Sequence, residues 1–212
     1  NCYCAPNSQF GSSGGFSGPI SNVTLGSINN TSVFPAASPY YTNYAPAAGT
    51  TTNVLPGLLY PLSVTIGQQA QTAVWIDWDQ SGTFDASEFT FLGNNSGTAN
   101  VTYNANINVP FTAAIGQTKM RVRTEVYFNA NMVGTNACTL LGYGESEDYT
   151  ITVDPLVPCA GLPAPGNTIA TPATVCPGGS TTLTLQNATS GTGVTYQWYN
   201  GAGIIAGATD AF

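Results

Sequence analysis

Charged side chains are scarce in this sequence: Asp, Glu, Lys and Arg make up 6% of its 212 residues, against about 25% in a typical globular chain. The only basic residues are Lys119, Arg121 and Arg123, and the formal net charge is −7. Binding to nucleic acids or to anionic membrane surfaces depends on clustered basic side chains. The composition therefore excludes nucleic acid as a partner and disfavours such membranes.

Histidine is absent from the sequence, which excludes catalysis by a histidine base and zinc binding through histidine. No apolar run reaches the ~20 residues of a membrane-spanning helix, so no membrane insertion is expected. None of the five cysteines belongs to a C-x-x-C pair, the usual spacing of a zinc site. Disulfides formed after export to an oxidising compartment explain the cysteines better, and we expect a secreted or cell-surface protein.

Alternation of apolar and polar residues predicts an all-β chain of about seven or eight strands, with no helical pattern between them. The expected strands are residues 20–28, 58–66, 72–77, 89–92, 98–109, 119–126 and 147–153. Without helical crossovers a parallel β/α fold is disfavoured. The sequence therefore predicts an antiparallel β-sandwich over residues 1–154, with a jelly-roll-like arrangement.

Residues 155–174 are rich in proline and predict an extended linker. Residues 175–212 contain two further alternating segments, 180–185 and 194–199, and Trp198 is a candidate core residue. An immunoglobulin-like domain needs about seven strands over ~100 residues, so this second β module is partial. Its uncovered strands should pair with other copies or other domains of the same surface protein.

Residues 75–88, WIDWDQSGTFDASE, have the spacing of a calcium loop, D-x-[DN]-x-[DN]-G-x5-E, with serine at the fifth position. The expected ligands are Asp77, Asp79, Ser81, the backbone carbonyl of Thr83, Asp85 directly or through water, and Glu88. Calcium takes six to eight oxygen ligands, and Gly82 permits the sharp bend. The β-branched and aromatic flanks predict strands on both sides. The alternative is an Asp/Gly-rich turn without an ion.

The three basic residues lie at every second position of one predicted strand and so share one face. Glu145, Glu147 and Asp148 follow in the segment GESED. We expect a ladder of ion pairs between Lys119, Arg121, Arg123 and these acids. Two alternatives stay open: the basic face could bind an anion, and the acids could complete the calcium site or form a solvated turn.

The segment WIDWDQSGTFDASE, followed by MRVR and then GESEDY, resembles the GEVED domain, named for its G-E-V-E-D-Y motif, with Ser146 in place of valine. Tyr3-Cys4 and ISNVTLGSINNTS are similar to the start of that domain, so the resemblance covers residues 2–154. Residues 159–212 resemble Ig-like repeats of secreted bacterial proteins. The resemblance implies a large multidomain surface protein, often exported by type IX secretion, and no defined activity.

Two disulfides are expected. Cys138 should pair with Cys4 or Cys2, and the resemblance favours Cys4 because Tyr3-Cys4 matches the family's opening. Cys159 and Cys176 should form the second bridge, which would join the linker to the second module.

These observations predict a non-catalytic, calcium-stabilised β module of an adhesive or structural surface protein, in which a fibre or matrix could be built from repeated domains. The alternative is a carbohydrate-binding accessory module of an extracellular hydrolase. In that case Tyr40, Tyr41, Tyr44 and Tyr60 could form a platform for sugar rings, although packing beneath the proline-rich loop explains them better. Asp85 and Glu88 could act as paired glycosidase carboxylates, but they fit calcium positions better.

Overall fold

The computed structural model describes residues 3–10, 18–157, 164–189, 191 and 194–210. The chain divides into two compact units, Asn1–Pro155 and Leu156–Phe212. This division lies next to the boundary expected after residue 154.

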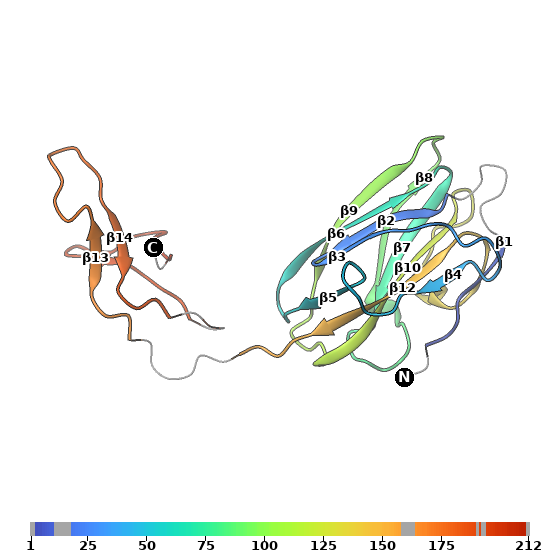
Figure 1. Ribbon diagram of the computed structural model, residues 1–212, viewed down its shortest axis with the longest axis horizontal. Coiled ribbons are helices and arrows are strands. Elements are labelled where there is room, and N and C mark those ends of the chain that lie inside the picture. Colours follow the sequence, from blue (N-terminus) through green and yellow to red (C-terminus); the bar gives the residue numbers. More distant parts are fainter. Residues whose placement is uncertain (1–2, 11–17, 158–163, 190, 192–193, 211–212) are drawn as a thin grey trace. The chain divides into compact units, whose positions relative to one another are not determined.

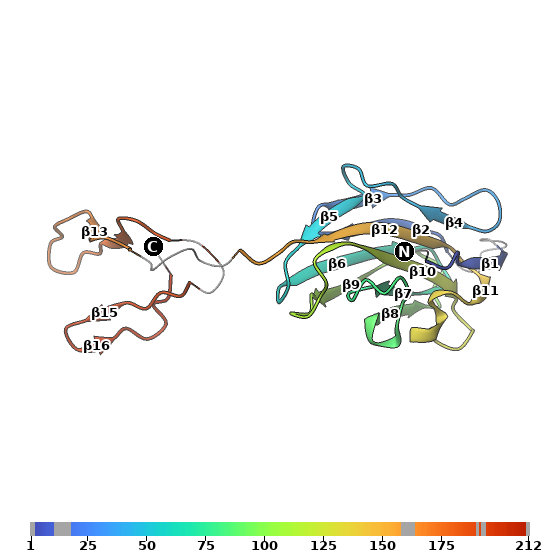
Figure 2. The same ribbon diagram turned by 90° about the horizontal axis from the view of Figure 1, so that it is seen from below.

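The first unit is a sandwich of two main sheets, which confirms the all-β prediction (Figure 1). The smaller sheet has the order β3-β2-β6-β9 and comprises β2 (Ile20–Leu25), β3 (Ile28–Thr31), β6 (Leu59–Ile66) and β9 (Val101–Asn108). The larger has the order β4-β12-β10-β7-β8, with β5 also paired to β12; its strands are β4 (Tyr41–Asn43), β5 (Thr51–Val54), β7 (Ala70–Ile76), β8 (Phe89–Asn95), β10 (Gly116–Val126) and β12 (Ser146–Val153). The view from below in Figure 2 shows the same strands.

The larger sheet is mixed rather than purely antiparallel. Both β4 and β5 run parallel to β12, whereas β12, β10, β7 and β8 pair in antiparallel fashion. The two parallel strands come from the proline-rich stretch after residue 34 and from the segment that follows it, for which the sequence predicted no strand. The prediction of an antiparallel sandwich is corrected in this respect.

The main core lies between the two sheets and follows the period-two pattern of the strands. Val23 and Leu25 of β2 and Val122 and Met120 of β10 all belong to it, and each is at most 1% exposed. Ile151 of β12 joins the same cluster. The strand register therefore follows from which face of each strand is apolar.

A second layer covers the opposite face of the larger sheet, and no sequence pattern indicated it. Trp75 on β7 packs with Phe84, Met132, Ala137 and Leu141 in a separate apolar cluster, and its indole Nε1 donates a 2.8 Å hydrogen bond to the carbonyl of Gly134. The covering segment contains the 3-10 helices η1 (Ala86–Glu88) and η2 (Gly134–Ala137) and the parallel pair β1 (Asn7–Phe10) and β11 (Leu140–Tyr143).

A disulfide between Cys4 and Cys138 fastens the N-terminal segment to this layer, as the resemblance implied. Cys176 is exposed and forms no disulfide with any residue of the described part of the chain. Cys159 lies outside the described residues, so its bridge to Cys176 stays a prediction.

The second unit contains two short antiparallel pairs, β13 (Thr168–Thr171) with β14 (Thr182–Leu185) and β15 (Tyr199–Asn200) with β16 (Gly203–Ile204). Strand β13 lies inside the expected linker 155–174, where the β-branched run TIAT overrides the surrounding prolines. Within the described part of this unit no residue is buried. The immunoglobulin-like fold of this unit stays a prediction.

Candidate metal site and buried charges

The loop of residues 77–88 joins β7 to β8, so it connects two strands and not two helices, as predicted from its flanks. Asp77 follows directly on the buried strand β7 and is 0% exposed. Gly82 has φ +84°, a conformation that an L side chain rarely adopts, and it lets the chain turn back toward Asp77.

Three carboxylates converge in this loop: ligand oxygens of Asp77, Asp79 and Glu88 lie within 4.8 Å of one another. Asp77 Oδ1 accepts a 3.0 Å hydrogen bond from the backbone N–H of Ser81, and Asp79 Oδ1 accepts one of 2.9 Å from the same N–H. Asp77 Oδ2 accepts bonds from Gly82 N–H at 3.0 Å and from the hydroxyl of Tyr3 at 2.6 Å. The loop backbone thus holds the predicted ligands at positions one and three of the loop in place.

Glu88 reaches back across the loop from its far end. Its Oε1 accepts a 2.6 Å bond from the backbone N–H of Trp78, and its Oε2 accepts a 2.9 Å bond from that of Asp85. Burial raises the pKa of Glu88, and the negative charge of Asp77 adds to the rise. The hydrogen bond from the Ser81 backbone lowers the pKa of the exposed Asp79.

The remaining predicted ligands lie in the same turn. The hydroxyls of Ser81 and Thr83 are 2.9 Å apart, and the Ser81 hydroxyl also donates to the Thr83 carbonyl at 3.4 Å. Asp85 is exposed and is not part of the cluster of three carboxylates. The structure therefore brings together the acids at positions one, three and twelve of the predicted loop and leaves the one at position nine outside.

A buried ion pair joins β10 to β12. Arg121 Nε and Nη2 donate to the two carboxylate oxygens of Asp148, both at 2.7 Å, and the two side chains are 0% and 2% exposed. The hydroxyl of Tyr41 donates a further bond of 2.8 Å to Asp148 Oδ2. Arg121 also donates to the carbonyls of Cys4 at 2.8 Å and of Ala137 at 3.0 Å. The pair is therefore hydrogen-bonded to β4, to the N-terminal segment and to η2.

Of the ladder of ion pairs predicted between the basic strand and the segment GESED, the structure shows the pair between Arg121 and Asp148. Side chains alternate along β12, so Ser146 and Asp148 face the arginines while Glu145 and Glu147 point into the core between the sheets. Register confirms this, since Arg121 lies opposite Asp148 but Arg123 lies opposite Ser146. The period-two rule that grouped the basic residues also separates the acids.

The other two basic residues use neutral partners. Arg123 Nε donates to the hydroxyl of Ser146 at 2.9 Å, and its terminal nitrogens donate to carbonyls including that of Thr139 at 3.1 Å. Lys119 Nζ donates to Asn43 Oδ1 at 2.8 Å and to Thr150 Oγ1 at 3.1 Å.

Burial lowers the pKa of Lys119 and brings that of Arg123 to about 9. Arg121 and Arg123 are 0% exposed, so the hypothesis that the basic face binds an external anion is wrong for these two residues.

Glu145 and Glu147 are buried on the core side of β12. The N–H of Ile20 donates a 2.9 Å bond to Glu145 Oε2, while Glu145 Oε1 is buried and has no hydrogen-bond partner among the residues that the structure describes. Glu147 accepts bonds from the hydroxyls of Tyr149 at 2.7 Å and Tyr44 at 3.1 Å. The hypothesis of a solvated acidic turn is therefore wrong for these two residues. They also lie too deep in the core to complete a metal site in the loop of residues 77–88.

The pKa values of both core glutamates are raised. Burial raises the pKa of Glu145 to about 8, and repulsion from the charge of Glu147 adds to the shift. Burial also raises the pKa of Glu147, while the hydroxyl of Tyr149 opposes that rise. The residue before them, Gly144, has φ +141°, and a Cβ there would lie 2.0 Å from the carbonyl oxygen of Thr124. The segment therefore requires glycine at this position.

Stability should depend on pH through Glu145. Its folded-state pKa of about 8 lies above the ordinary value of 4.5, so the folded state holds the proton more tightly than the unfolded state. Stability should then fall as pH rises from about 4.5 to about 8, by up to ~1.4 kcal/mol per pH unit, and level off above that range. Glu145→Gln should flatten this part of the profile. Urea unfolding of both proteins across the range measures it, and parallel profiles would contradict the prediction.

The tyrosines do not form the sugar platform that the sequence suggested. The hydroxyls of Tyr41 and Tyr44 are bonded to Asp148 and Glu147, and the hydroxyl of Tyr60 accepts a 2.9 Å bond from the N–H of Leu55. Tyr44 and Tyr60 also pack against the main core. Packing, the alternative explanation, accounts for Tyr41, Tyr44 and Tyr60, and the ring of Tyr40 stacks on that of Phe34 with 5.5 Å between their centroids.

Residues 71–152 match the family model of the GEVED domain. The matched stretch begins in β7 and ends in β12, so it includes the loop of residues 77–88, the basic strand β10 and the segment GESED. The resemblance expected over residues 2–154 is supported for this stretch. No curated protein and no solved structure matches the chain.

Proposed function

We propose that the first unit is a calcium-stabilised, non-catalytic β module of a secreted or cell-surface protein with a structural or adhesive role. The observation that carries this proposal is the convergence of Asp77, Asp79 and Glu88 at one end of the larger sheet. Among the described residues, the salt bridge joins Arg121 to Asp148, and neither of these residues belongs to the loop. The carboxylates of the loop therefore repel one another with only neutral hydrogen-bond donors to offset the repulsion.

The residues of the loop fit a calcium ion chemically. Calcium is a hard cation that prefers carboxylate, hydroxyl and carbonyl oxygens, and the loop offers all three kinds. Asp77 Oδ1 and the two carboxylate oxygens of Glu88 each accept one hydrogen bond, and a carboxylate oxygen has two acceptor positions. Asp77 Oδ2 accepts two hydrogen bonds, from Gly82 and Tyr3. Asp77, Asp79 and Glu88 would hold the ion with Ser81 and the Thr83 carbonyl, and Asp85 would take part directly or through water.

Contacts of the loop explain how an ion there would stabilise the whole unit. Phe84, within the loop, lies under the guanidinium of Arg121, with 4.7 Å from Cζ to the ring centroid. Tyr3 bonds to Asp77, packs against Phe84 with 5.2 Å between ring centroids, and precedes the disulfide-bonded Cys4. Ordering of the loop would therefore be transmitted to the buried ion pair and to the N-terminal segment.

Several observations support a secreted, non-catalytic module. The Cys4–Cys138 disulfide is typical of oxidising compartments, and the match to the GEVED domain favours an extracellular protein. The acids and arginines of β10 and β12 are engaged inside the fold, where a substrate would not reach them. In the described part of the chain, no helix has the length and hydrophobicity to cross a membrane.

Removal of calcium should lower the melting temperature of the first unit. A ligand at about 100 times its Kd stabilises a domain of this size by roughly 5–10 °C. Thermal unfolding of the full chain in calcium and in excess chelator measures this difference. Asp79→Ala, a change at an exposed side chain, should melt alike in both buffers, whereas Asp210→Asn in the second unit should keep the full difference. The same melting temperature for the unaltered protein in both buffers would refute calcium binding.

We further propose that the second unit is completed by contact with another copy or another domain of the same surface protein. Large apolar side chains of this unit are exposed to solvent, including Val175 at 46%, Leu183 at 40% and Ile204 at 63%. A small unit without buried residues gains little stability by itself, and exposed strand edges are templates for pairing. Light scattering should show concentration-dependent assembly of the full chain into a fibre or oligomer, and a monodisperse monomer with an ordered second unit would contradict it.

A further inference from the structure

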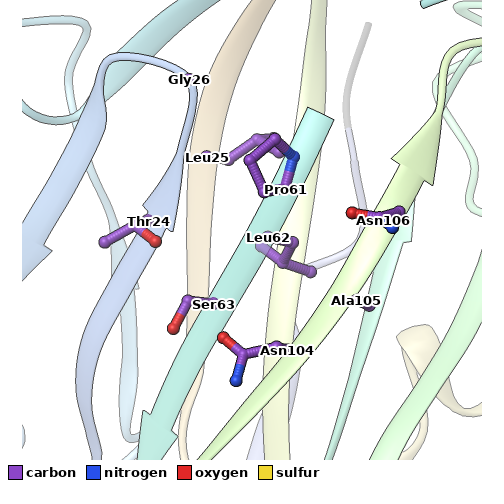
Figure 3. Close-up of a pocket in the computed structure, with 9 residues that line it drawn as sticks. All are labelled: Thr24, Leu25, Gly26, Pro61, Leu62, Ser63, Asn104, Ala105 and Asn106. Carbon is purple, nitrogen blue, oxygen red and sulfur yellow. The ribbon is translucent and has the colours of Figure 1, made fainter. Parts of the chain in front are cut away.

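The outer face of the smaller sheet carries a pocket of about 480 Å³ that none of the arguments above uses (Figure 3). It spans β2, β6 and β9, three neighbouring strands. Its lining residues are Thr24, Leu25, Gly26, Pro61, Leu62, Ser63, Asn104, Ala105 and Asn106.

Strand register places the polar side chains of this pocket in rows. Thr24 lies opposite Ser63, and Ser63 lies opposite Asn104, so the three form one row across the sheet. In the next row Pro61 lies opposite Asn106. Because side chains alternate along a strand, these residues share the face that points away from the core. Figure 3 shows the side chains of Thr24, Ser63 and Asn104 side by side across the three strands.

Within the part of the chain that the structure describes, these polar side chains have no hydrogen-bond partner. No side-chain hydrogen bond to another described residue is formed by Thr24, Ser63, Asn104 or Asn106, and none of the four is buried. The neighbouring row of the same face differs. There, the hydroxyls of Thr65 and Thr102 are 2.8 Å apart, and Asn22 Nδ2 bonds to Thr31 Oγ1 at 3.3 Å. The free donors and acceptors are thus concentrated at the pocket, while adjacent polar residues satisfy one another.

The chemistry of the lining selects the class of ligand. The two asparagine amides and the two hydroxyls can each both donate and accept hydrogen bonds, and so can the hydroxyls of a sugar. The lining contains no Asp, Glu, Lys or Arg, so it offers no counter-charge to phosphate, sulfate or uronic acid groups. Pro61 adds an apolar ring beside the polar rows. The volume of the pocket lies in the range of small-molecule sites.

We propose that this pocket binds a neutral oligosaccharide, with Asn104 and Asn106 of β9 as the main hydrogen-bonding residues. The amides would bridge adjacent hydroxyls of one sugar ring, while Thr24 and Ser63 bond to its neighbour across the sheet. The site lies on the sheet that does not carry the loop of residues 77–88. The proposal rests on the polar rows of β2, β6 and β9 and not on a bound calcium ion, and it adds glycan recognition to the structural role proposed above.

The test is a titration of the full chain, kept in excess calcium, with neutral hexasaccharides. The probes are cellohexaose, laminarihexaose, mannohexaose and chitohexaose at up to about 10 mM, where a site of millimolar affinity would be nearly filled. Chemical-shift changes in the ¹H–¹⁵N spectrum report binding and its location. At least one probe should shift resonances of β2, β6 and β9.

Two variants and a matched control locate the site. Asn104→Ala and Asn106→Ala should each weaken binding by roughly five-fold or more, because each removes an amide that bonds to the sugar. Asn108→Ala changes the same residue type on the same strand and face but outside the pocket, and it should bind like the unaltered protein. All three side chains are exposed, so folding should be retained. The proposal fails if no probe binds, or if Asn108→Ala weakens binding as much as the pocket variants do.

Discussion

Asp148→Ala should lower the free energy of unfolding by roughly 3–5 kcal/mol, the range found when one partner of a buried ion pair is removed. The guanidinium of Arg121 is 0% exposed, and both of its bonds to Asp148 would be lost. The hydroxyl of Tyr41 would lose its acceptor as well. Urea unfolding of the full chain in calcium measures the effect.

A matched pair of variants separates the charge from the packing. Asp148→Asn keeps the size of the side chain and an acceptor oxygen but leaves Arg121 without a counter-charge, so its loss should also be large. Replacing Arg121 and Asp148 together by apolar residues should be less damaging than Asp148→Ala alone, because no unpaired charge remains buried. A loss below about 1 kcal/mol in Asp148→Ala, as for exposed ion pairs, would contradict the burial described here.

Removal of the disulfide should have an effect of similar size. Cys4 and Cys138 are separated by 134 residues, and on the chain-entropy model a loop of that length restricts the unfolded chain by about 5 kcal/mol. The double variant Cys4→Ser, Cys138→Ser should therefore unfold at much lower urea concentration. It would also free the segment that brings Tyr3 to Asp77.

Cys176→Ser is the control for the cysteine chemistry. This side chain is exposed, belongs to the second unit and takes no part in the Cys4–Cys138 bridge, so its replacement should change the free energy of unfolding of the first unit by no more than about 0.5 kcal/mol. If the double variant were as stable as Cys176→Ser, the N-terminal segment would not be fastening the second layer.

The local features of the fold were predictable from the sequence because they repeat at short range. Alternation identified β6, β9, β10 and β12 within a few residues, and the flanks of residues 77–88 predicted a strand-to-strand loop. The short strands β4 and β5 were missed, because they lie between prolines and are stabilised by pairing with β12, far along the chain. Propensity carries little information about such pairing.

Burial of the arginines could not be predicted from alternation alone. Arg121 and Arg123 occupy the polar face of a two-faced strand, which normally meets solvent. The segment that covers them, residues 127–143, has no periodic pattern, and its attachment depends on Cys138 meeting Cys4. The placement of Glu145 and Glu147, by contrast, was predictable from the sequence. They lie three and one positions before Asp148, and residues an odd number of positions apart on a strand point to opposite faces.

The pocket on the smaller sheet depends on register between strands. Thr24, Ser63 and Asn104 are far apart in the sequence and become neighbours only through the pairing of β2, β6 and β9. Single-sequence patterns indicate which face of a strand is polar but not which polar residues lie opposite one another. Only the assembled sheet shows which of them lack partners.

Calcium titration of the chelator-treated full chain by calorimetry tests the central claim most directly. We expect one binding event per chain in the unaltered protein and none in Asp79→Ala, with Asp210→Asn binding like the unaltered protein. Absence of binding heat together with an unchanged melting temperature in calcium, or equal binding by Asp79→Ala, would show that the carboxylates of residues 77–88 do not form a calcium site.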